Sequence, residues 1–349
     1  GDEFLIVLTA VEAPDAAARV AEKILERVTA PFELEGHQLG TSFSIGIALY
    51  PDDGRSAEHL MKNADTAMYH AKESGRNTYR FFDEAMNANA LERLYLENAL
   101  RRALENSEFD LHYQPQVDLG TGHIIGLEAL LRWYSPSLGN VPPIRFIPLA
   151  EECGLIVPIG EWVLREACRQ ARQWQDQGLP PIPVAVNLSA MQFRRDDIVA
   201  TVYRTLMDSG LKGQWLELEL TESLLMQSGP DVEQTLGQLK ALGVRMSIDD
   251  FGTGYSSLSS LKDLPATKLK LDKSFIDALP GDRRTFAVVK AMTQLARELG
   301  MVVVAEGVET HAQTAALDEA GVDAIQGYAI ARPMPEEALL NWLNLRRKA

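Results

Sequence analysis

Cysteine and histidine are scarce in this chain, which has two cysteines and six histidines among 349 residues. Cys153 and Cys168 lie 15 residues apart in a stretch with helical periodicity, a spacing that fits neither a zinc cluster nor a disulfide framework. The sequence also lacks a run of about 18 apolar residues and a basic signal-peptide region at its start, so it predicts no membrane span. These absences favour a reducing, cytoplasmic location for this portion of the protein.

Basic residues are outnumbered by acidic ones. The 34 Lys and Arg residues against 49 Asp and Glu residues give a formal net charge of −15. Binding to a nucleic-acid polymer depends on clustered Lys and Arg that neutralise phosphates, and the sequence has no such cluster. The charge therefore excludes a nucleic-acid polymer as a partner, and a phosphate-containing substrate would need cations that are bound locally.

The length and apolar content predict two folded parts, because 349 residues exceed one typical domain and 46% of them are hydrophobic. In residues 1–83 we expect an α/β fragment with a buried strand at 5–8, which has no earlier element to pair with and so indicates further chain upstream. The fragment continues with the following expected elements: a helix over 16–28, a β-rich run over 41–49 and a helix over 56–73. Near-helical leucine spacing predicts a linker helix over 84–106.

Residues 107–349 alternate between predicted strands and helices, a pattern typical of a (β/α)8 barrel. The expected strands are 111–119, 124–133, 184–188, 216–221, 244–249, 268–273, 301–305 and 324–329. The first two are joined by a short turn, Gly120-Thr121-Gly122-His123, so we expect them to pair antiparallel. The sequence therefore predicts a modified TIM-type α/β barrel with one antiparallel strand.

Polar side chains lie on or just after these strands, and strand ends of a barrel converge on one face. The residues that share this placement are Glu128, Asn187, Glu219, Glu222, Asp249, Asp250, Lys270, Asp272, Glu306 and Gln326. Lys268, Lys270 and Asp272 share one strand parity, as do Glu217 and Glu219, so Glu217 is a further inward candidate without an assigned role. Carboxylates with one Asn carbonyl form an oxygen-rich set that suits Mg²⁺ or Mn²⁺ better than zinc.

Two divalent ions are plausible here, because like charges this close need neutralisation and adjacent aspartates allow one carboxylate to bridge two ions. Such a site would activate water and stabilise the attacking and leaving oxygens of a phosphodiester. Lys270 would orient that water or offset charge in the transition state, and the forked guanidinium of Arg132 would bind a phosphate oxygen. A single acid at a strand end is more often a helix cap or a solvated loop residue. The prediction of a metal site therefore depends on the occurrence of such residues at the ends of several strands.

Ordered motifs carry a resemblance to a known family over residues 95–345. They are Tyr113-Gln114-Pro115, Glu128-Ala129-Leu130-Leu131-Arg132-Trp133, Asn187-Leu188-Ser189, Glu219-Leu220-Thr221-Glu222, residues 249–258 (DDFGTGYSSL), Lys270-Leu271-Asp272, Glu306-Gly307-Val308-Glu309 and Gln326-Gly327-Tyr328. In this series the chain resembles the EAL family of cyclic di-GMP phosphodiesterases.

The resemblance implies a role for each matched residue. The metal ligands would be Glu128, Asn187, Glu219, Asp249, Asp250 and Glu306, with Asp249 bridging two ions, and Lys270 would contact the catalytic water. Glu222 would position the 249–258 loop. The substrate pocket and its surroundings would include Gln114, Arg132, Asp272 and Gln326.

The first 83 residues resemble the C-terminal half of a GGDEF (diguanylate cyclase-like) domain. The resemblance rests on Gly1-Asp2-Glu3-Phe4, Ser44-Ile45-Gly46-Ile47-Ala48, residues 64–72 and Gly75-Arg76-Asn77. The other half of that domain is not in this sequence, so we expect no cyclase activity from these residues alone, and we interpret Lys72 as part of a solvated helix face.

We therefore expect hydrolysis of cyclic di-GMP to linear pGpG with two Mg²⁺ or Mn²⁺ ions. The alternative is a catalytically silent cyclic di-GMP receptor, and a further alternative is a Mg²⁺-dependent barrel acting on another carboxylate or phosphate. The resemblance also implies a homodimer through the EAL domain. An upstream sensor, or an anchor in the inner membrane, would belong to a longer protein.

Overall fold

The structure is a computed structural model in which the chain forms two compact units, Gly1–Asn98 and Ala99–Ala349. It describes residues 3–9, 14–29, 32–34, 37–39, 41–195, 197–226, 230–252, 261 and 264–346. The domain boundaries expected from the sequence, at 83/84 and 106/107, stay predictions.

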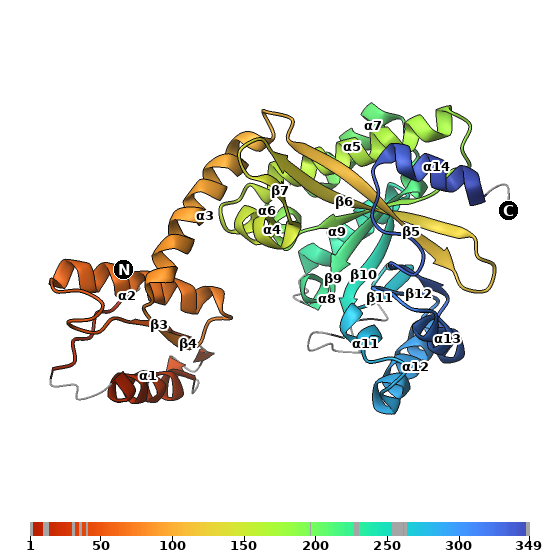
Figure 1. Ribbon diagram of the computed structural model, residues 1–349. Helices are drawn as coiled ribbons and strands as arrows, with labels where there is room; N and C mark the ends of the chain where they lie inside the picture. The colour runs from red at the N-terminus through yellow and green to blue at the C-terminus, as the bar shows by residue number, and fades with distance from the viewer. Residues whose placement is uncertain are drawn as a thin grey trace. The chain divides into compact units, whose positions relative to one another are not determined.

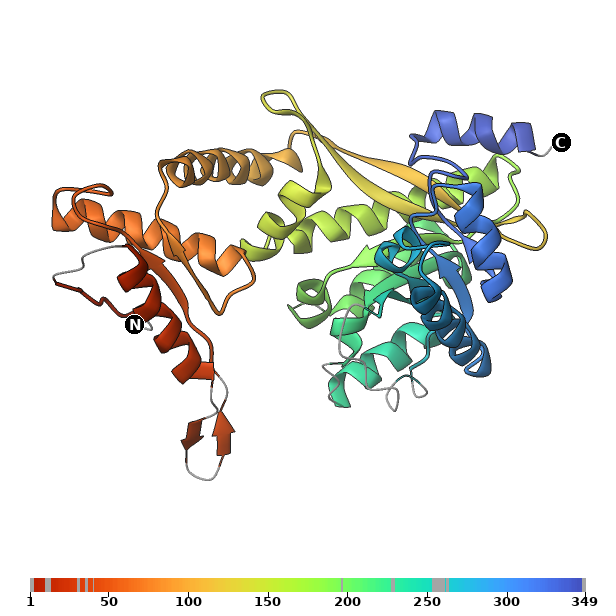
Figure 2. The ribbon, with the colours of Figure 1, turned by 60° about the horizontal axis from the view of Figure 1, so that its bottom comes forward.

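The N-terminal unit combines helices with two small sheets (Figure 1). Strands β3 (Ser44–Ile47) and β4 (Thr78–Phe81) pair in parallel, and α2 (Ala57–Glu73) connects them. The unit also contains α1 (Pro14–Thr29), the antiparallel pair β1 (Phe32–Leu34) and β2 (His37–Leu39), and most of α3 (Glu84–Ala103). Figure 2 shows this short hairpin extending beyond one end of α1. Strands β1, β2 and β4 were not expected from the sequence.

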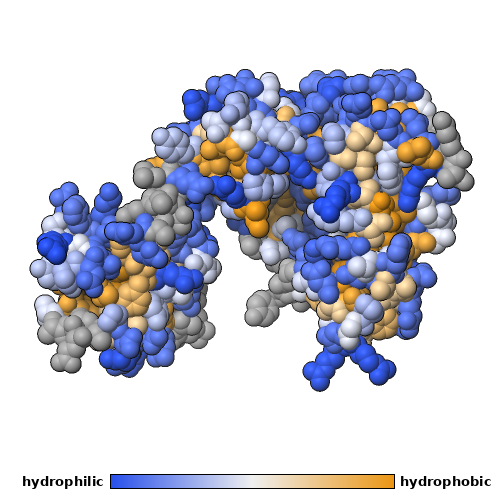
Figure 3. Space-filling model, in the orientation of Figure 1, coloured by the Kyte–Doolittle hydropathy of each residue, from blue (hydrophilic) through white to orange (hydrophobic). Residues whose placement is uncertain are grey.

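Residues 5–8 form no strand, so that prediction is wrong. Phe4 is 81% exposed and Val7 is 75% exposed, and the segment has no pairing partner within the described residues. Apolar side chains alone therefore did not produce a buried strand, because a strand also needs a neighbour for its backbone groups. Figure 3 shows hydrophobic surface on this unit. Lys72 is exposed on α2, as expected.

Eight strands of the second unit close into a barrel. They are β5 (Phe109–Asp118), β6 (Ile124–Ser135), β8 (Val184–Leu188), β9 (Leu216–Thr221), β10 (Arg245–Phe251), β11 (Lys268–Leu271), β12 (Val302–Ala305) and β13 (Ala324–Ile325). Their order is β5-β13-β12-β11-β10-β9-β8-β6, and the β5–β6 pairing closes the circle. A ninth strand, β7 (Gly139–Val141), pairs with β6 outside the barrel.

Strand β5 is antiparallel to both of its barrel neighbours, whereas the other barrel pairings are parallel. The modified barrel with one antiparallel strand is thus confirmed. The turn after β5 follows from Asp118, whose Oδ1 accepts hydrogen bonds from the backbone N–H and the hydroxyl of Thr121 at 2.7 and 2.8 Å. This Asx-type turn leaves too few residues for a crossover helix.

Helices cover the outside of the barrel (Figure 1). They are α4 (Pro143–Glu152), α5 (Ile156–Asp176), α6 (Ala190–Arg195), α7 (Ile198–Ser209), α8 (Glu222–Met226), α9 (Pro230–Ala241), α11 (Lys273–Asp277), α12 (Arg283–Glu298), α13 (His311–Ala320) and α14 (Glu336–Arg346). The expected linker segment contains α3 (Glu84–Ala103). Among the described helices, none is both long and apolar enough to cross a membrane.

Strand burial explains why one mouth of the barrel becomes polar. Leu216, Leu218 and Leu220 on β9 are almost fully buried against the helices, so the alternate side chains, Glu217 and Glu219, point into the barrel. The same alternation holds on β11. The barrel interior therefore contains layers of charged and amide side chains, and the layer nearest the strand ends forms the candidate site.

Candidate active site

Each of the eight barrel strands contributes one side chain to a single polar cluster at the carboxyl-end mouth. Glu306 and Gln326 lie just beyond their strands, and the others lie on theirs. In order around the barrel the cluster contains Gln114 (β5), Gln326 (β13), Glu306 (β12), Lys270 (β11), Asp249 (β10), Glu219 (β9), Asn187 (β8) and Glu128 (β6). The sequence-predicted convergence of strand ends is therefore present in the structure.

Lys270 lies at the centre of the acidic residues and is 1% exposed. Its Nζ is 2.7 Å from Glu219 Oε2, 2.5 Å from Glu306 Oε1 and 3.1 Å from Asp249 Oδ1. Glu128 Oε2 is farther away, at 3.8 Å. One buried ammonium thus contacts carboxylates from four different strands or strand ends.

Amides hold Glu128 in one orientation. Asn187 Nδ2 donates to Glu128 Oε1 at 2.7 Å, and Gln326 Nε2 donates to Glu128 Oε2 at 2.5 Å. The same Gln326 nitrogen donates to Gln114 Oε1 at 3.0 Å, and Gln114 Nε2 donates to the carbonyl of Ala331. Both oxygens of Glu128 are therefore positioned by hydrogen bonds.

A β-bulge allows two consecutive aspartates to face one site. In a regular strand Asp249 and Asp250 would point to opposite faces. Here the pairing of β10 with β11 shifts register between Ile248 and Phe251, and Asp250 has a positive φ of 53°. As a result, carboxylate oxygens of Asp249, Asp250 and Glu306 lie within 4.8 Å of one another.

The electrostatics of the cluster favour binding of cations. Burial alone would lower the pKa of Lys270, but the carboxylates of Glu128 and Glu219 outweigh it and raise this pKa well above its ordinary value. Burial, reinforced by the charge of Glu128, raises the pKa of Glu219 well above its ordinary value. Burial and the neighbouring Asp249 likewise raise the pKa of Asp250. One ammonium thus does not neutralise the four carboxylates of the cluster and the adjacent carboxylate of Asp250.

The donor set fits divalent cations. Glu219 Oε1 is buried and has no hydrogen-bond partner within the described part of the chain, so one carboxylate oxygen at the centre is available to a ligand. The surrounding carboxylate and amide oxygens are the donors that Mg²⁺ and Mn²⁺ prefer. The residues present therefore suit the metal site that the sequence predicts.

Three predicted residues lie around this cluster. Asp272 caps α11, since its Oδ1 accepts from the backbone N–H of Ser274 at 3.0 Å and from the Ser274 hydroxyl at 2.5 Å. Arg132 is half-buried on β6 and donates to the carbonyl of Leu131. Glu222 accepts a hydrogen bond from the backbone N–H of Gly252. Residues 253–258 of the DDFGTGYSSL loop lie outside the described residues, as does Asp2.

A deeper polar layer contains Gln116, Lys268 and Glu217. Glu217 is predicted from the sequence to point inward, whereas Gln116 is not among the predicted residues. Lys268 Nζ contacts Gln116 Oε1 at 2.7 Å and Glu217 Oε2 at 2.8 Å. Gln116 is two residues beyond Gln114 on the same strand, so strand alternation would have identified it as an inward residue.

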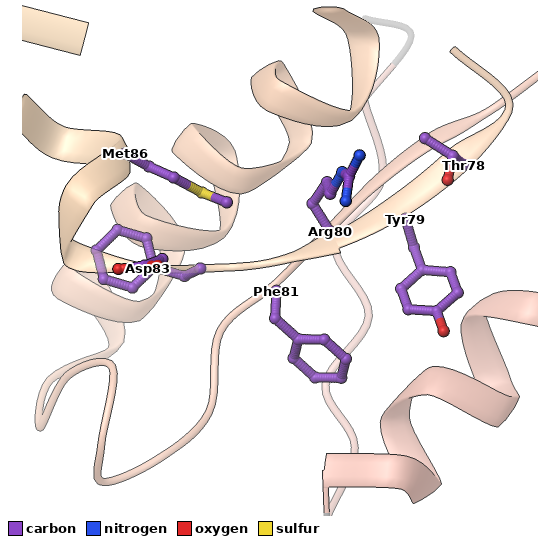
Figure 4. Close-up of a pocket in the computed structure, with 7 residues that line it drawn as sticks. Thr78, Tyr79, Arg80, Phe81, Asp83 and Met86 are labelled. Carbon is purple, nitrogen blue, oxygen red and sulfur yellow. The ribbon is translucent and has the colours of Figure 1, made fainter. Parts of the chain in front are cut away.

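A separate surface hollow lies in the N-terminal unit (Figure 4). Its lining residues come from one short stretch of chain, 78–86. In Figure 4 the labelled Arg80, Phe81 and Tyr79 side chains lie along strand β4 and do not converge on a common point. Among its lining residues Asp83 is the single carboxylate, so we do not place the active site there.

Fold and site together define a class of protein, a mixed-strand (β/α) barrel with an acidic mouth whose oxygen donors suit divalent cations. Family comparisons agree with it, because the EAL domain model matches residues 97–333 and the model for the diguanylate cyclase GGDEF domain matches residues 1–78. The chain belongs to the EAL domain family, and its EAL domain is preceded by a partial GGDEF match.

Curated relatives share this arrangement. The bifunctional diguanylate cyclase/cyclic di-GMP phosphodiesterase MucR of Pseudomonas aeruginosa is 51% identical over 340 residues, covering 97% of this chain and 50% of that protein. The cyclic di-GMP phosphodiesterase PdeR of Escherichia coli is 40% identical over 342 residues, covering 98% of this chain and 51% of that protein. The chain thus spans about half the length of these relatives.

Solved structures agree with the fold. A PaMucR phosphodiesterase in complex with c-di-GMP has a TM-score of 0.68 and 50% identity, covering 70% of this chain and 99% of that one. The EAL domain of Mycobacterium smegmatis DcpA has a TM-score of 0.59 and 34% identity, covering 68% of this chain and 97% of that one.

Proposed function

We propose that this chain hydrolyses one phosphodiester bond of cyclic di-GMP to give linear pGpG. The observation that carries the proposal is the convergence of one side chain from each barrel strand into an acidic cluster around Lys270. The phosphodiesterase names of MucR and PdeR and the c-di-GMP complex of the PaMucR domain support the substrate.

Two Mg²⁺ or Mn²⁺ ions would be bound by residues of the cluster. The proposed ligands are Glu128, Asn187, Glu219, Asp249, Asp250 and Glu306. When bound, such ions supply Lewis-acid activation and offset the negative charge that develops on a phosphodiester. The hydrogen bonds from Asn187 and Gln326 keep the Glu128 carboxylate oriented for this role.

Lys270 acts in this proposal as a fixed cation. Its raised pKa keeps it protonated, so it donates hydrogen bonds and does not serve as a general base. Its ammonium would orient the attacking water and offset charge in the transition state. Because pGpG carries a 5′-phosphate, the water oxygen bonds to phosphorus, the bond from phosphorus to the 3′ oxygen breaks, and that oxygen takes up a proton.

Substrate contacts would come from the rim of the cluster. Arg132 lies four residues beyond Glu128 on the same face of β6, and its forked guanidinium suits a phosphate oxygen. Gln114, Gln326 and Asp272 would complete the pocket. We also propose that the EAL domain forms a homodimer and that a sensor or an inner-membrane anchor lies upstream in the longer protein.

The test is turnover of purified protein with cyclic di-GMP and Mg²⁺ or Mn²⁺, with products separated by chromatography. Glu128→Gln and EDTA should each abolish pGpG formation, whereas Glu319→Gln, a matched change at an exposed position on α13, should leave it unchanged. Metal-dependent pGpG formation with these controls supports the phosphodiesterase. Tight binding of cyclic di-GMP without turnover in either metal would instead support a silent receptor.

A further inference from the structure

A buried ion pair lies one layer beneath the acidic cluster. Lys268 and Glu217 are 6% and 1% exposed, and each precedes a cluster residue by two positions on its strand. Lys268 Nζ lies 2.7 Å from Glu217 Oε1 and 2.8 Å from Glu217 Oε2. Burying two charges is expensive, and apolar residues of similar volume would often be at least as stable. Stability alone therefore does not explain why this pair is inside the barrel.

The pair connects to the candidate site through two amides. Lys268 Nζ donates to Gln116 Oε1 at 2.7 Å, and Gln116 Nε2 donates to Gln326 Oε1 at 3.0 Å. Gln326 Nε2 then donates to Glu128 Oε2 at 2.5 Å. We call this chain of three hydrogen bonds from Lys268 to Glu128 the amide relay.

The direction of the relay follows from donor and acceptor chemistry. A lysine ammonium has donors but no acceptor, so Gln116 must turn its oxygen toward Lys268. Its nitrogen is then left to face Gln326, which must present its own oxygen to Gln116. The nitrogen of Gln326 consequently points at Glu128, whose ionised carboxylate only accepts. Lys268 at one end and Glu128 at the other therefore impose the same orientation on both amides.

The barrel wall leaves space for this arrangement. Gln116 pairs with Gly126 across β5 and β6, and a Cβ added at Gly126 would lie 2.9 Å from Gln116 Oε1. It would also lie 3.6 Å from Lys268 Nζ. A side chain at Gly126 would therefore press on the first link of the relay.

We propose that Lys268, paired with Glu217, is a positioning residue that acts through Gln116 and Gln326 to keep a hydrogen-bond donor on Glu128. The inference rests on the proposed function, in which Glu128 is a metal ligand. Groups that orient a metal ligand typically change metal affinity by about 10- to 100-fold when they are removed.

The experiment is a double-mutant cycle in which the dissociation constant for Mn²⁺ is measured by calorimetry on the full chain. Gln116→Met should weaken Mn²⁺ binding about 10-fold. In a Gln326→Met background the same change should alter the affinity by less than about twofold, because the relay is already cut downstream. The charge-neutral double replacement K268M/E217M should behave as Gln116→Met does in both backgrounds.

Ser247→Ala is the matched control. Ser247 is fully buried beside Lys268 on β10, and its hydroxyl has no hydrogen-bond partner among the described residues. Its removal should leave the Mn²⁺ affinity within about twofold of wild type. Urea unfolding of every variant identifies any loss of Mn²⁺ affinity that comes from a less stable fold.

Equal weakening by Gln116→Met in both backgrounds would overturn the relay, as would a wild-type chain that fails to bind Mn²⁺. The readout is independent of turnover. A wild-type chain that binds Mn²⁺ but forms no pGpG would overturn the proposed function. The Mn²⁺ affinities of the variants would still test the amide relay in that case.

Discussion

The carboxylate of Glu222 accepts a hydrogen bond from the backbone N–H of Gly252 at 2.8 Å. Glu222 begins α8 directly after β9, whereas Gly252 directly follows β10, so the bond joins the ends of two neighbouring strands. Glu222 is 2% exposed, which shields this bond from water. The bond fixes the chain just beyond Asp249 and Asp250.

Replacing Glu222 by alanine should therefore disturb the cluster without removing any of its ligands. We expect kcat/KM for cyclic di-GMP and the affinity for Mn²⁺ to fall about 10- to 100-fold. Glu222→Gln is the matched control, because its amide oxygen accepts the same backbone N–H. This variant should retain most of the kcat/KM and most of the Mn²⁺ affinity. Equal losses in the two variants would show that the charge of Glu222, and not its bond to Gly252, is what matters.

Divalent cations should stabilise the fold. Carboxylates of Asp249, Asp250 and Glu306 crowd together, and bound cations relieve that repulsion only in the folded chain. With free Mn²⁺ at 100 times its dissociation constant, the free energy of unfolding should rise by about 2.7 kcal/mol. Urea titrations with MnCl₂, and with NaCl at matched ionic strength, measure it. The effect should disappear in Asp249→Asn, and stabilisation by NaCl alone would contradict a specific site.

The affinity for Mn²⁺ should rise with pH up to about 8. Burial raises the pKa of Glu306 from 4.5 to about 8, with Lys270 opposing the shift and Asp249 reinforcing it. Between these values the folded, metal-free chain holds a proton that the unfolded chain has released, so its free energy of unfolding falls as pH increases. Mn²⁺ must displace that proton, and its binding therefore strengthens until Glu306 is ionised.

Mn²⁺ titrations at a series of pH values measure this dependence, and unfolding of metal-free protein measures the linked loss of stability. Glu306→Gln, which cannot ionise, should flatten the part of the profile that approaches pH 8. An affinity that stays constant from pH 6 to 8 in the wild type would contradict the assignment of Glu306 as the titrating ligand.

Much of the barrel could be predicted from its sequence because its strands have strong signals. All eight predicted barrel strands are present, with ends displaced by a few residues. The largest difference is β13, expected over 324–329 but ending at Ile325. Gly327 approaches the backbone of Val308 too closely for a strand with side chains to continue there. A contact between segments so far apart in the chain produces no local sequence pattern from which the end of the strand could be predicted.

The candidate site could likewise be predicted only in part, because some of its geometry depends on contacts between distant segments. Strand alternation places Glu219 and Lys270 inside the barrel, but it would put Asp249 and Asp250 on opposite faces. The bulge that brings them together depends on the positive φ of Asp250 and on the pairing with β11. The exposed segment 5–8 illustrates the opposite case, since an apolar run predicts burial only when another element covers it.

Gly327 and Gly300 differ in the space around them. A Cβ at Gly327 would lie 2.2 Å from the carbonyl oxygen and 2.3 Å from the nitrogen of Val308, and these backbone atoms cannot rotate away. Gly327→Ala should therefore displace the neighbouring Gln326, weaken its bond to Glu128 and destabilise the fold by about 1–3 kcal/mol.

Gly300 is the control. Its φ is +73° and nothing lies within 4 Å of its added Cβ, so Gly300→Ala should cost about 1 kcal/mol of backbone strain and leave pGpG formation unchanged. Urea unfolding and initial rates at low substrate concentration compare the two variants. Wild-type rates in Gly327→Ala would mean that Gln326 tolerates displacement, and its contact with Glu128 would then have no role in positioning the site.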